Sequence, residues 1–222
     1  MIVAIDGPAG AGKSSVAKTV AKRLGFHYLD TGAMYRACAL RAMVLGVALN
    51  DAEGVARIAA SEPIEFRYRE GDVLPSIVTI GGHDVTHEIR TPEVDGAVSA
   101  VAATPAVRAA MVVQQREIAA HDNCVVEGRD IGTTVFPDAE LKVFVTADPE
   151  VRARRRAEQN VGRNMGADFD AVFAAILARD EADSTREVAP LTQATDAVVV
   201  DTTSLTFEQV VDRVVSLVEE RR

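Results

Sequence analysis

Residues 7–14 read Gly7-Pro8-Ala9-Gly10-Ala11-Gly12-Lys13-Ser14. This stretch matches the pattern G-x-x-x-x-G-K-[ST], in which glycines let backbone N–H groups turn inward around a phosphate. A short β-branched run at residues 2–6 precedes it, and apolar residues recur at helical spacing over residues 13–24. Because the motif requires a strand before it and a helix after it, we interpret the stretch as a P-loop, with the phosphates at the helix N-terminus.

The P-loop predicts binding of ATP together with Mg²⁺. Lys13 is expected to reach the β- and γ-phosphates, and the Ser14 hydroxyl is expected to be a ligand of the metal ion. The residues expected to bind ATP are Gly7, Pro8, Ala9, Gly10, Ala11, Gly12, Lys13, Ser14 and Ser15. The motif alone does not separate a kinase from a GTPase, a motor or a regulator, but the sequence contains no guanine-specific N-K-x-D.

Four further apolar runs predict strands, at residues 26–29, 124–126, 141–146 and 197–200, with helical segments between and after them. Strands that are apolar on both faces and alternate with helices are typical of a parallel sheet covered by helices. We therefore predict an α/β fold of the P-loop NTPase type with a five-stranded parallel sheet.

Residues 63–90 have a different character. Apolar and charged residues alternate over residues 64–68 and again over residues 76–80, which predicts a small antiparallel β insert with one solvent-facing side.

Helical segments are expected on both sides of this insert. The first is rich in Ala, Leu and Met and is expected to run to about Leu45, with Thr31 as its N-cap. The second covers residues 94–120, and Pro105 is expected to end one helix and start another.

Charge and composition limit the classes of partner. The chain has 222 residues and a formal net charge of −9, and a nucleic-acid surface needs an excess of Lys and Arg, so we expect no nucleic-acid partner. The two cysteines and four histidines lack zinc-ligand spacing. The apolar opening is too short for a signal peptide or a membrane span. We expect a single domain over residues 1–222 and a cytoplasmic monomer without membrane contact.

A second phosphate site is indicated by residues 29–36, which read Leu29-Asp30-Thr31-Gly32-Ala33-Met34-Tyr35-Arg36. They put a hydroxyl at the expected helix start and an arginine about one turn further on. On spacing alone, a capped helix with a surface arginine explains these residues equally well. At this point the chain resembles the bacterial cytidylate kinase family, and the resemblance extends over essentially the whole length.

The resemblance rests on specific blocks. Besides the P-loop they are residues 30–36, 88–91, 105–108, 127–133, 136–139 and 179–191, together with Ser99. The insert before Arg90 is also characteristic, because related nucleotide kinases usually carry a shorter segment there. The chain departs from the family in having Glu127 where Asp is frequent and Thr31 where Ser is common.

The resemblance implies transfer of the γ-phosphoryl group of ATP to CMP and dCMP. It implies a CMP site made of Thr31, Arg36, Ser99, Arg108, Arg129, Asp130, Arg179, Asp183 and Arg186. Within that site Asp130, with Ser99 and Arg108, would recognise the cytosine edge. The chain then divides into a P-loop core (1–30), a monophosphate-binding region (31–105), more core (106–150), a lid region (151–186) and a last core segment (187–222).

The chemistry of Arg129 and Asp130 agrees with this role. They follow the strand predicted at residues 124–126, and ligands of open α/β folds bind at the carboxyl edge of the sheet. Arginine binds phosphate bidentately, and an aspartate accepts a hydrogen bond from an exocyclic amino group. Such an acceptor favours cytosine over uracil, whose carbonyl would meet it with a second acceptor. A surface ion pair is the alternative for these two residues.

Three more arginines, Arg152, Arg155 and Arg156, share one face of a predicted helix. The glycine-bearing residues 160–168, with Arg163, follow and predict a short lid over the triphosphate. A solvated helix face is the alternative for this run. The residues expected to stabilise the transferring group are Lys13, Arg129, Arg155 and Arg186.

No histidine or serine–histidine pair is needed for such a reaction, because the acceptor phosphate is largely a dianion near neutral pH. The expected chemistry is in-line transfer driven by positioning and electrostatic stabilisation. Two alternatives remain open on sequence alone: another P-loop small-molecule kinase, of the UMP, shikimate or gluconate type, and a nucleotide-binding switch without turnover.

Overall fold

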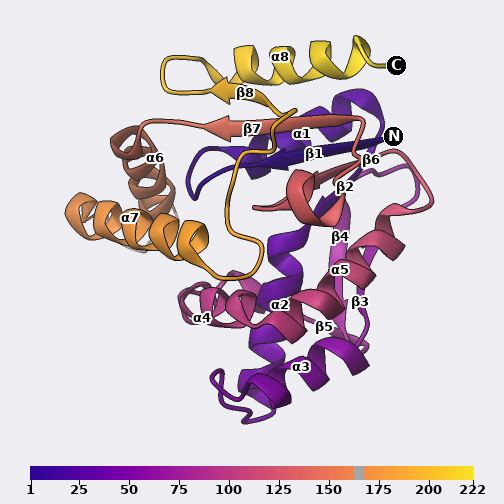
Figure 1. Ribbon diagram of the computed structural model, residues 1–222, viewed down its shortest axis with the longest axis vertical. Helices are drawn as coiled ribbons and strands as arrows, with labels where there is room; N and C mark the ends of the chain where they lie inside the picture. The colour runs from indigo at the N-terminus through magenta and orange to yellow at the C-terminus, as the bar shows by residue number, and fades with distance from the viewer. Residues whose placement is uncertain (163–167) are drawn as a thin grey trace.

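The computed structural model describes residues 1–162 and 168–222, with a five-stranded parallel sheet at its centre (Figure 1). The strands are β1 (Ile2–Asp6), β2 (His27–Asp30), β6 (Cys124–Glu127), β7 (Leu141–Thr146) and β8 (Val198–Asp201), in the spatial order β2-β6-β1-β7-β8. Every adjacent pair is parallel, so the carboxyl ends of all five strands meet at one edge. The predicted fold class is confirmed, and each strand lies within one residue of its predicted position.

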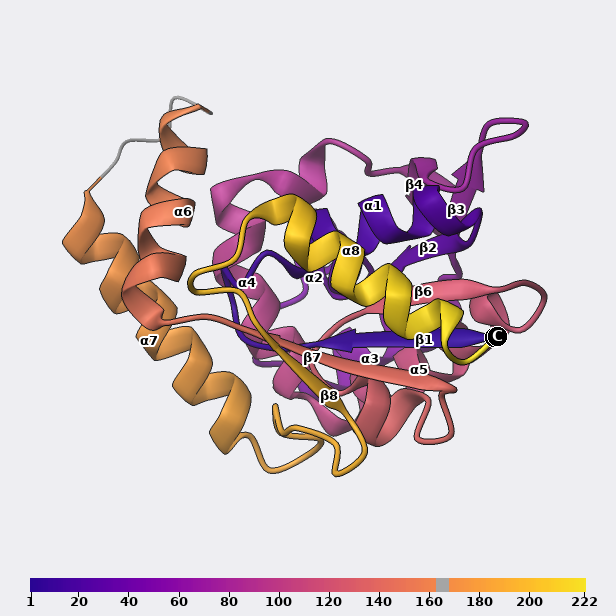
Figure 2. The same ribbon diagram turned by 90° about the horizontal axis from the view of Figure 1, so that it is seen from above.

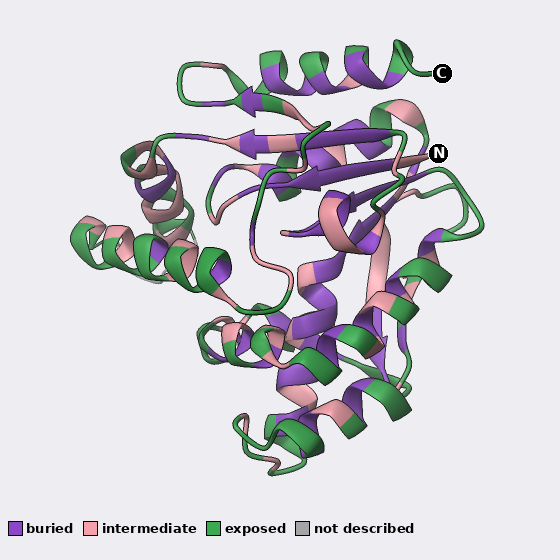
Figure 3. Cartoon of the chain, in the orientation of Figure 1, coloured by how far each residue is buried: buried purple, intermediate pink, exposed green. Residues whose placement is uncertain are grey.

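Helices cover both faces of this sheet. Figure 2 shows α1 (Lys13–Leu24) and α8 (Phe207–Glu219) together on one face, while α2 (Thr31–Val44) and α5 (Pro105–Ala119) extend from the other face in Figure 1. Successive residues of β1 enter opposite cores: Val3 and Ile5 pack with α1 and α8, and Ala4 packs on the side of α2. This double burial explains the continuous apolar runs of the strands, and the buried segments of the sheet are visible in Figure 3.

The predicted insert is an antiparallel sheet of β3 (Ile64–Tyr68), β4 (Pro75–Ile80) and a third short strand, β5 (His83–Asp84). A 3₁₀ turn, η1 (Glu88–Arg90), follows it. Helix α3 (Ala52–Ser61) precedes it and was not predicted from the sequence; it packs against α2 and α5.

The start of α2 corrects one expectation. The N-cap is Asp30, whose carboxylate accepts a hydrogen bond from the Ala33 N–H at 2.9 Å. Thr31 is already in the helix, and its hydroxyl donates to the Glu127 carbonyl oxygen at 2.7 Å. The prediction of Thr31 as N-cap was therefore wrong, because its hydroxyl is used across the sheet edge and the preceding carboxylate satisfies the free amide.

Two pairs of helices complete the chain. Helix α4 (Pro92–Ala103) and helix α5 meet at 98°, at the break predicted for Pro105. Within the described ranges no single helix has the length and apolarity to cross a membrane; α4 and α5 reach that composition only as this bent pair. Helix α6 (Pro149–Val161) and helix α7 (Phe169–Thr185) flank the predicted lid, of which residues 163–167, with Arg163, lie outside the described residues.

Gly7 provides a test of the packing between the P-loop and the sheet. Its φ is +144°, and a Cβ at this position would overlap the carbonyl oxygen of Val145 in β7. Gly7→Ala should therefore lower the free energy of unfolding by about 2 kcal/mol or more, measured by urea denaturation. The matched control is Gly96→Ala in α4, where the added Cβ meets open space. It should raise stability by about 0.5–1 kcal/mol, and equal effects of the two variants would contradict this packing.

Candidate functional site

A cleft of about 700 Å³ opens at the carboxyl edge of the parallel sheet. It lies between the P-loop, the start of α2, helix α4, the loop after β6, and helices α6 and α7. The cleft is lined by every residue predicted for the acceptor nucleotide: Thr31, Arg36, Ser99, Arg108, Arg129, Asp130, Arg179, Asp183 and Arg186. The fold thus gathers side chains from five separate segments around one space.

The P-loop forms one end of this cleft. Six of its predicted residues line the cleft: Ala9, Gly10, Gly12, Lys13, Ser14 and Ser15. The other three, Gly7, Pro8 and Ala11, are absent from the lining and shape the loop from behind; the Pro8 carbonyl oxygen accepts a hydrogen bond from Lys13 Nζ at 2.7 Å. Burial, together with the nearby Arg129 guanidinium, lowers the pKa of Lys13 to about 7. An anion at this point would restore the charged ammonium form.

Ser14 contacts an acidic residue at the end of β6. Its hydroxyl donates to Glu127 Oε1 at 2.7 Å, and the Tyr28 hydroxyl donates to Glu127 Oε2 at 2.8 Å. A hydroxyl and a carboxylate beside a P-loop are oxygen ligands of the kind that Mg²⁺ prefers. Sequence analysis noted Glu127 only as a departure from a family pattern; its place at the end of the strand beside β1 was the available signal.

Asp6, the last residue of β1, fixes the loop on which Asp130 stands. Its carboxylate oxygens accept hydrogen bonds from the N–H groups of Ile131 and Gly132, both at 2.8 Å. These amides begin a single π-helical turn, η2 (Ile131–Val135). Burial raises the pKa of Asp6 to about 6, although the two backbone hydrogen bonds oppose this shift. The turn, which was not predicted, holds Asp130 at the cleft.

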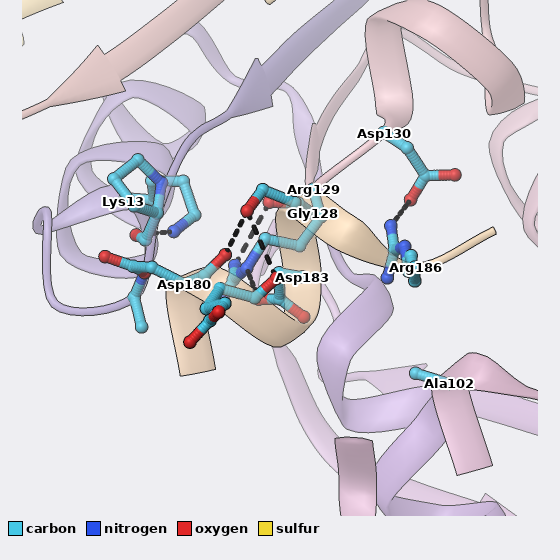
Figure 4. A network of polar contacts seen from close by, with 12 residues as sticks. Lys13, Ala102, Gly128, Arg129, Asp130, Asp180, Asp183 and Arg186 are labelled. Carbon is cyan, nitrogen blue, oxygen red and sulfur yellow. Dashed lines mark hydrogen bonds and ion pairs between the residues drawn. The ribbon is translucent and has the colours of Figure 1, made fainter. Parts of the chain in front are cut away.

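Arginine–aspartate pairs line the cleft in two groups, Arg129 with Asp183 near Lys13, and Asp130 with Arg186 farther from it (Figure 4). Asp130 accepts a hydrogen bond from Arg108 on one oxygen and from Arg186, at 3.2 Å, on the other. Arg129 Nε donates to Asp183 at 2.8 Å. These side chains come from α5, from the loop after β6, and from α7 and its C-cap, so the pairs tie α7 to the sheet edge.

Arg179 is a further arginine that lines the cleft. Its Nε, like that of Arg108, is buried and has no hydrogen-bond partner within the described part of the chain. Burial and the neighbouring Arg129 guanidinium lower its pKa to about 10. A guanidinium in such surroundings favours an incoming anion.

Further charged groups line the cleft, most of which were not predicted as site residues from the sequence. Arg36 Nε donates to Asp95 in α4 at 2.9 Å, and Arg156 in α6 donates to the same carboxylate at 3.0 Å. Arg90 donates to Asp30 at 2.9 Å. Of this group only Arg36 was predicted as a site residue, because the others depend on contacts between distant segments.

Arg155 differs from the expectation. Its guanidinium donates to the hydroxyl and the carbonyl oxygen of Thr202, at 2.8 and 2.7 Å, and it is not among the residues that line the cleft. Arg152, one turn earlier in α6, contacts the P-loop: its guanidinium donates to the Ala9 carbonyl oxygen at 2.9 Å. Arg156 is the arginine of this run that lines the cleft. A step of one residue turns a helix by about 100°, so helical spacing alone did not identify the right side chain.

Known proteins similar to this chain identify its family. The sequence profile of the cytidylate kinase family matches residues 3–220. A cytidylate kinase of Geobacillus sp. (strain WCH70) is 48% identical over 219 residues, which cover 99% of this chain and 96% of that protein. A cytidylate kinase of Mycolicibacterium paratuberculosis (strain ATCC BAA-968 / K-10) is 50% identical over 223 residues, which cover 100% of this chain and 96% of that protein.

Among solved structures, an uncharacterized protein from Eubacterium ventriosum ATCC 27560 aligns with 100% of this chain and 99% of its own, with a TM-score of 0.55. At 11% identity this similarity concerns the fold alone. The profile match and the full-length relatives establish the family, and the chain belongs to the cytidylate kinase family.

Proposed function

We propose that this protein transfers the γ-phosphoryl group of ATP directly to CMP and dCMP. The observation that carries the proposal is a single cleft with two ends suited to anions. One end is the P-loop with Lys13, and the other is the group of arginines on α2 and at the end of α7, with Arg129 of the loop after β6 close to Lys13. A kinase with a phosphate as acceptor needs both ends, because two polyanions must approach each other.

The acceptor would lie at the arginine end. Arg36, Arg129 and Arg179 would bind its phosphate, and Asp130 would accept a hydrogen bond from the cytosine amino group, with Ser99 and Arg108 beside it. Although Asp130 already binds two arginines, each carboxylate oxygen keeps a further lone pair for this contact. Thr31 and Asp183 complete the pocket in this proposal.

The donor would lie on the P-loop with Mg²⁺. Ser14 would be a ligand of the ion, and the Glu127 carboxylate would accept a hydrogen bond from a water bound to the ion. Their hydroxyl and carboxylate groups fit these roles. When bound, the ion neutralises charge on the donor phosphates. Lys13, Arg129 and Arg186 would stabilise charge on the transferring group, whereas Arg155 is not retained in this role because of its contact with Thr202.

The acceptor oxygen attacks without a general base, because a phosphate monoester is mostly a dianion at neutral pH. Closure of the monophosphate-binding region (31–105) and the lid region (151–186) over the cleft would exclude water and favour transfer over hydrolysis. The proposal includes a single domain and a cytoplasmic monomer, with which two buried free thiols, Cys38 and Cys124, are compatible. A shikimate-type acceptor accounts for neither the buried Asp130 nor the insert.

A panel of acceptors tests the proposal directly. With ATP and Mg²⁺, ADP formation should be fast with CMP and dCMP, slower with UMP, and slowest with AMP, GMP and shikimate, in a coupled steady-state assay. Release of ADP at the same rate without any acceptor would contradict the assignment and favour an ATPase.

Asp130→Asn is the matched variant for the base contact, because it keeps the shape and removes the charge. The ratio of kcat/KM for CMP to that for UMP should fall by about 10- to 100-fold, since leaving a buried polar group without its partner costs about 1–3 kcal/mol. Urea denaturation of the variant checks that the fold is retained. An unchanged ratio would show that Asp130 does not read the base.

The lowered pKa of Lys13 predicts that donor binding is linked to protons. At pH 8 most Lys13 side chains are neutral in the free protein, and the phosphates favour the ammonium form, so ADP binding should take up about one proton. The affinity for ADP should fall as the pH rises above 7. Calorimetry in two buffers of different ionisation enthalpy measures the uptake. Lys13→Arg, which stays protonated, should abolish it; equal uptake in both proteins would exclude Lys13 as the group responsible.

A further inference from the structure

Asp95 in α4 lines the cleft, and the proposed reaction assigns no role to it. Its carboxylate is about 20% exposed. One oxygen accepts a hydrogen bond from Arg36 Nε at 2.9 Å, and the other accepts from Arg156 Nη2 at 3.0 Å. Arg36 belongs to α2 and Arg156 to α6. One carboxylate therefore joins the acceptor side of the cleft to the helix that enters the lid region.

The contact between Asp95 and Arg36 orients the guanidinium without occupying the nitrogens that would bind a phosphate. Asp95 contacts Nε, so among the described residues the two terminal nitrogens of the guanidinium remain available. Nη1 points towards Gly32 at the start of α2, 3.1 Å from where a Cβ of that glycine would lie. Because the guanidinium is planar, a carboxylate on Nε sets the direction of its other N–H groups. Asp95 thus holds Arg36 with its phosphate-binding nitrogens facing the helix N-terminus.

The charge of Asp95 is maintained by its surroundings. Burial opposes ionisation of this carboxyl, but Arg36 and Arg156 outweigh it and hold the pKa below the ordinary value, with a smaller contribution from Arg179. The three guanidinium groups would repel one another without an anion between them. Asp95 supplies that anion in the protein without nucleotides.

We propose that Asp95 is a positioning residue that couples the two nucleotide sites through Arg36 and Arg156. The inference rests on the proposed function and adds to it a physical link between donor and acceptor. A donor that holds α6 against the cleft would also hold the Arg156–Asp95 contact, and with it the orientation of Arg36, when the acceptor phosphate arrives. The second nucleotide then loses less conformational freedom on binding, so each nucleotide strengthens the binding of the other.

Calorimetry of CMP binding tests the link. The dissociation constant of CMP is measured alone and with a saturating non-hydrolysable ATP analogue and Mg²⁺, and the ratio of the two is the coupling factor. The wild-type factor should be about five or more, the lower end of ordinary allosteric coupling. Asp95→Asn and Arg156→Gln should each reduce it to near one, and the double variant should lose no more than either, because both changes break one chain of contacts.

Arg154→Gln is the matched control on the same helix. Arg154 is 69% exposed, pairs only with Glu150 at 3.7 Å among the described residues, and does not line the cleft, so the coupling factor should stay at its wild-type value. Because Arg156 is 34% exposed, Arg156→Gln keeps the test open if Asp95→Asn does not fold.

Three results would overturn the inference. They are a wild-type factor of one, an unchanged factor in Arg156→Gln, and tighter binding of CMP alone by Asp95→Asn, which would identify Asp95 as a competitor of the phosphate. A wild-type protein that binds no CMP would instead contradict the proposed function itself.

Discussion

Ion pairs between arginines and buried or half-buried aspartates hold the cleft together. The protein carries a net charge of −9, yet this one space is lined by Lys13 and by the guanidinium groups of Arg36, Arg90, Arg108, Arg129, Arg156, Arg179 and Arg186. Such a group of like charges is tolerated only if anions lie among them. Asp30, Asp95, Asp130 and Asp183 are such anions, and they come from the end of β2, from α4, from the loop after β6, and from α7. The same contacts therefore neutralise the site and join its walls.

The parallel sheet makes this arrangement possible. Its carboxyl edge places the ends of β1, β2 and β6 side by side, and each contributes an acidic residue at its end: Asp6, Asp30 and Glu127. Asp6 holds the turn after Asp130, Asp30 caps α2, and Glu127 contacts the P-loop through Ser14. Two cationic groups in the cleft still lack an anionic partner among the described residues. They are Lys13, whose pKa is lowered, and Arg179, whose Nε has no hydrogen-bond partner in the described part of the chain. Phosphates would satisfy both.

Much of this architecture follows from short patterns in the sequence. The P-loop, the five strands and the insert have local signals, namely glycine spacing, double-sided apolar runs and alternation, and they lie where those signals predicted. Arg108 and Asp183 were predicted as site residues only through the family resemblance, because no local sequence pattern indicates them. Asp95 was missed, and Arg156 was named only as one of three arginines on a helix face, because their contact joins positions 61 residues apart. Arg155 was assigned to the cleft because a helical repeat does not tell which side faces the sheet, and the π-helical turn after Asp130 depends on Asp6, far away in the chain.

A single molecule that spans both ends of the cleft tests this account most directly. Adenosine and cytidine joined through five phosphates carry the donor and the acceptor on one chain, and calorimetry in the presence of Mg²⁺ measures the affinity. If the P-loop and the arginine end face each other across one cleft, this compound should bind at least about 100-fold more tightly than either ATP or CMP alone. Binding no tighter than that of the better single nucleotide would show that the two sites cannot be occupied together, and would contradict the account.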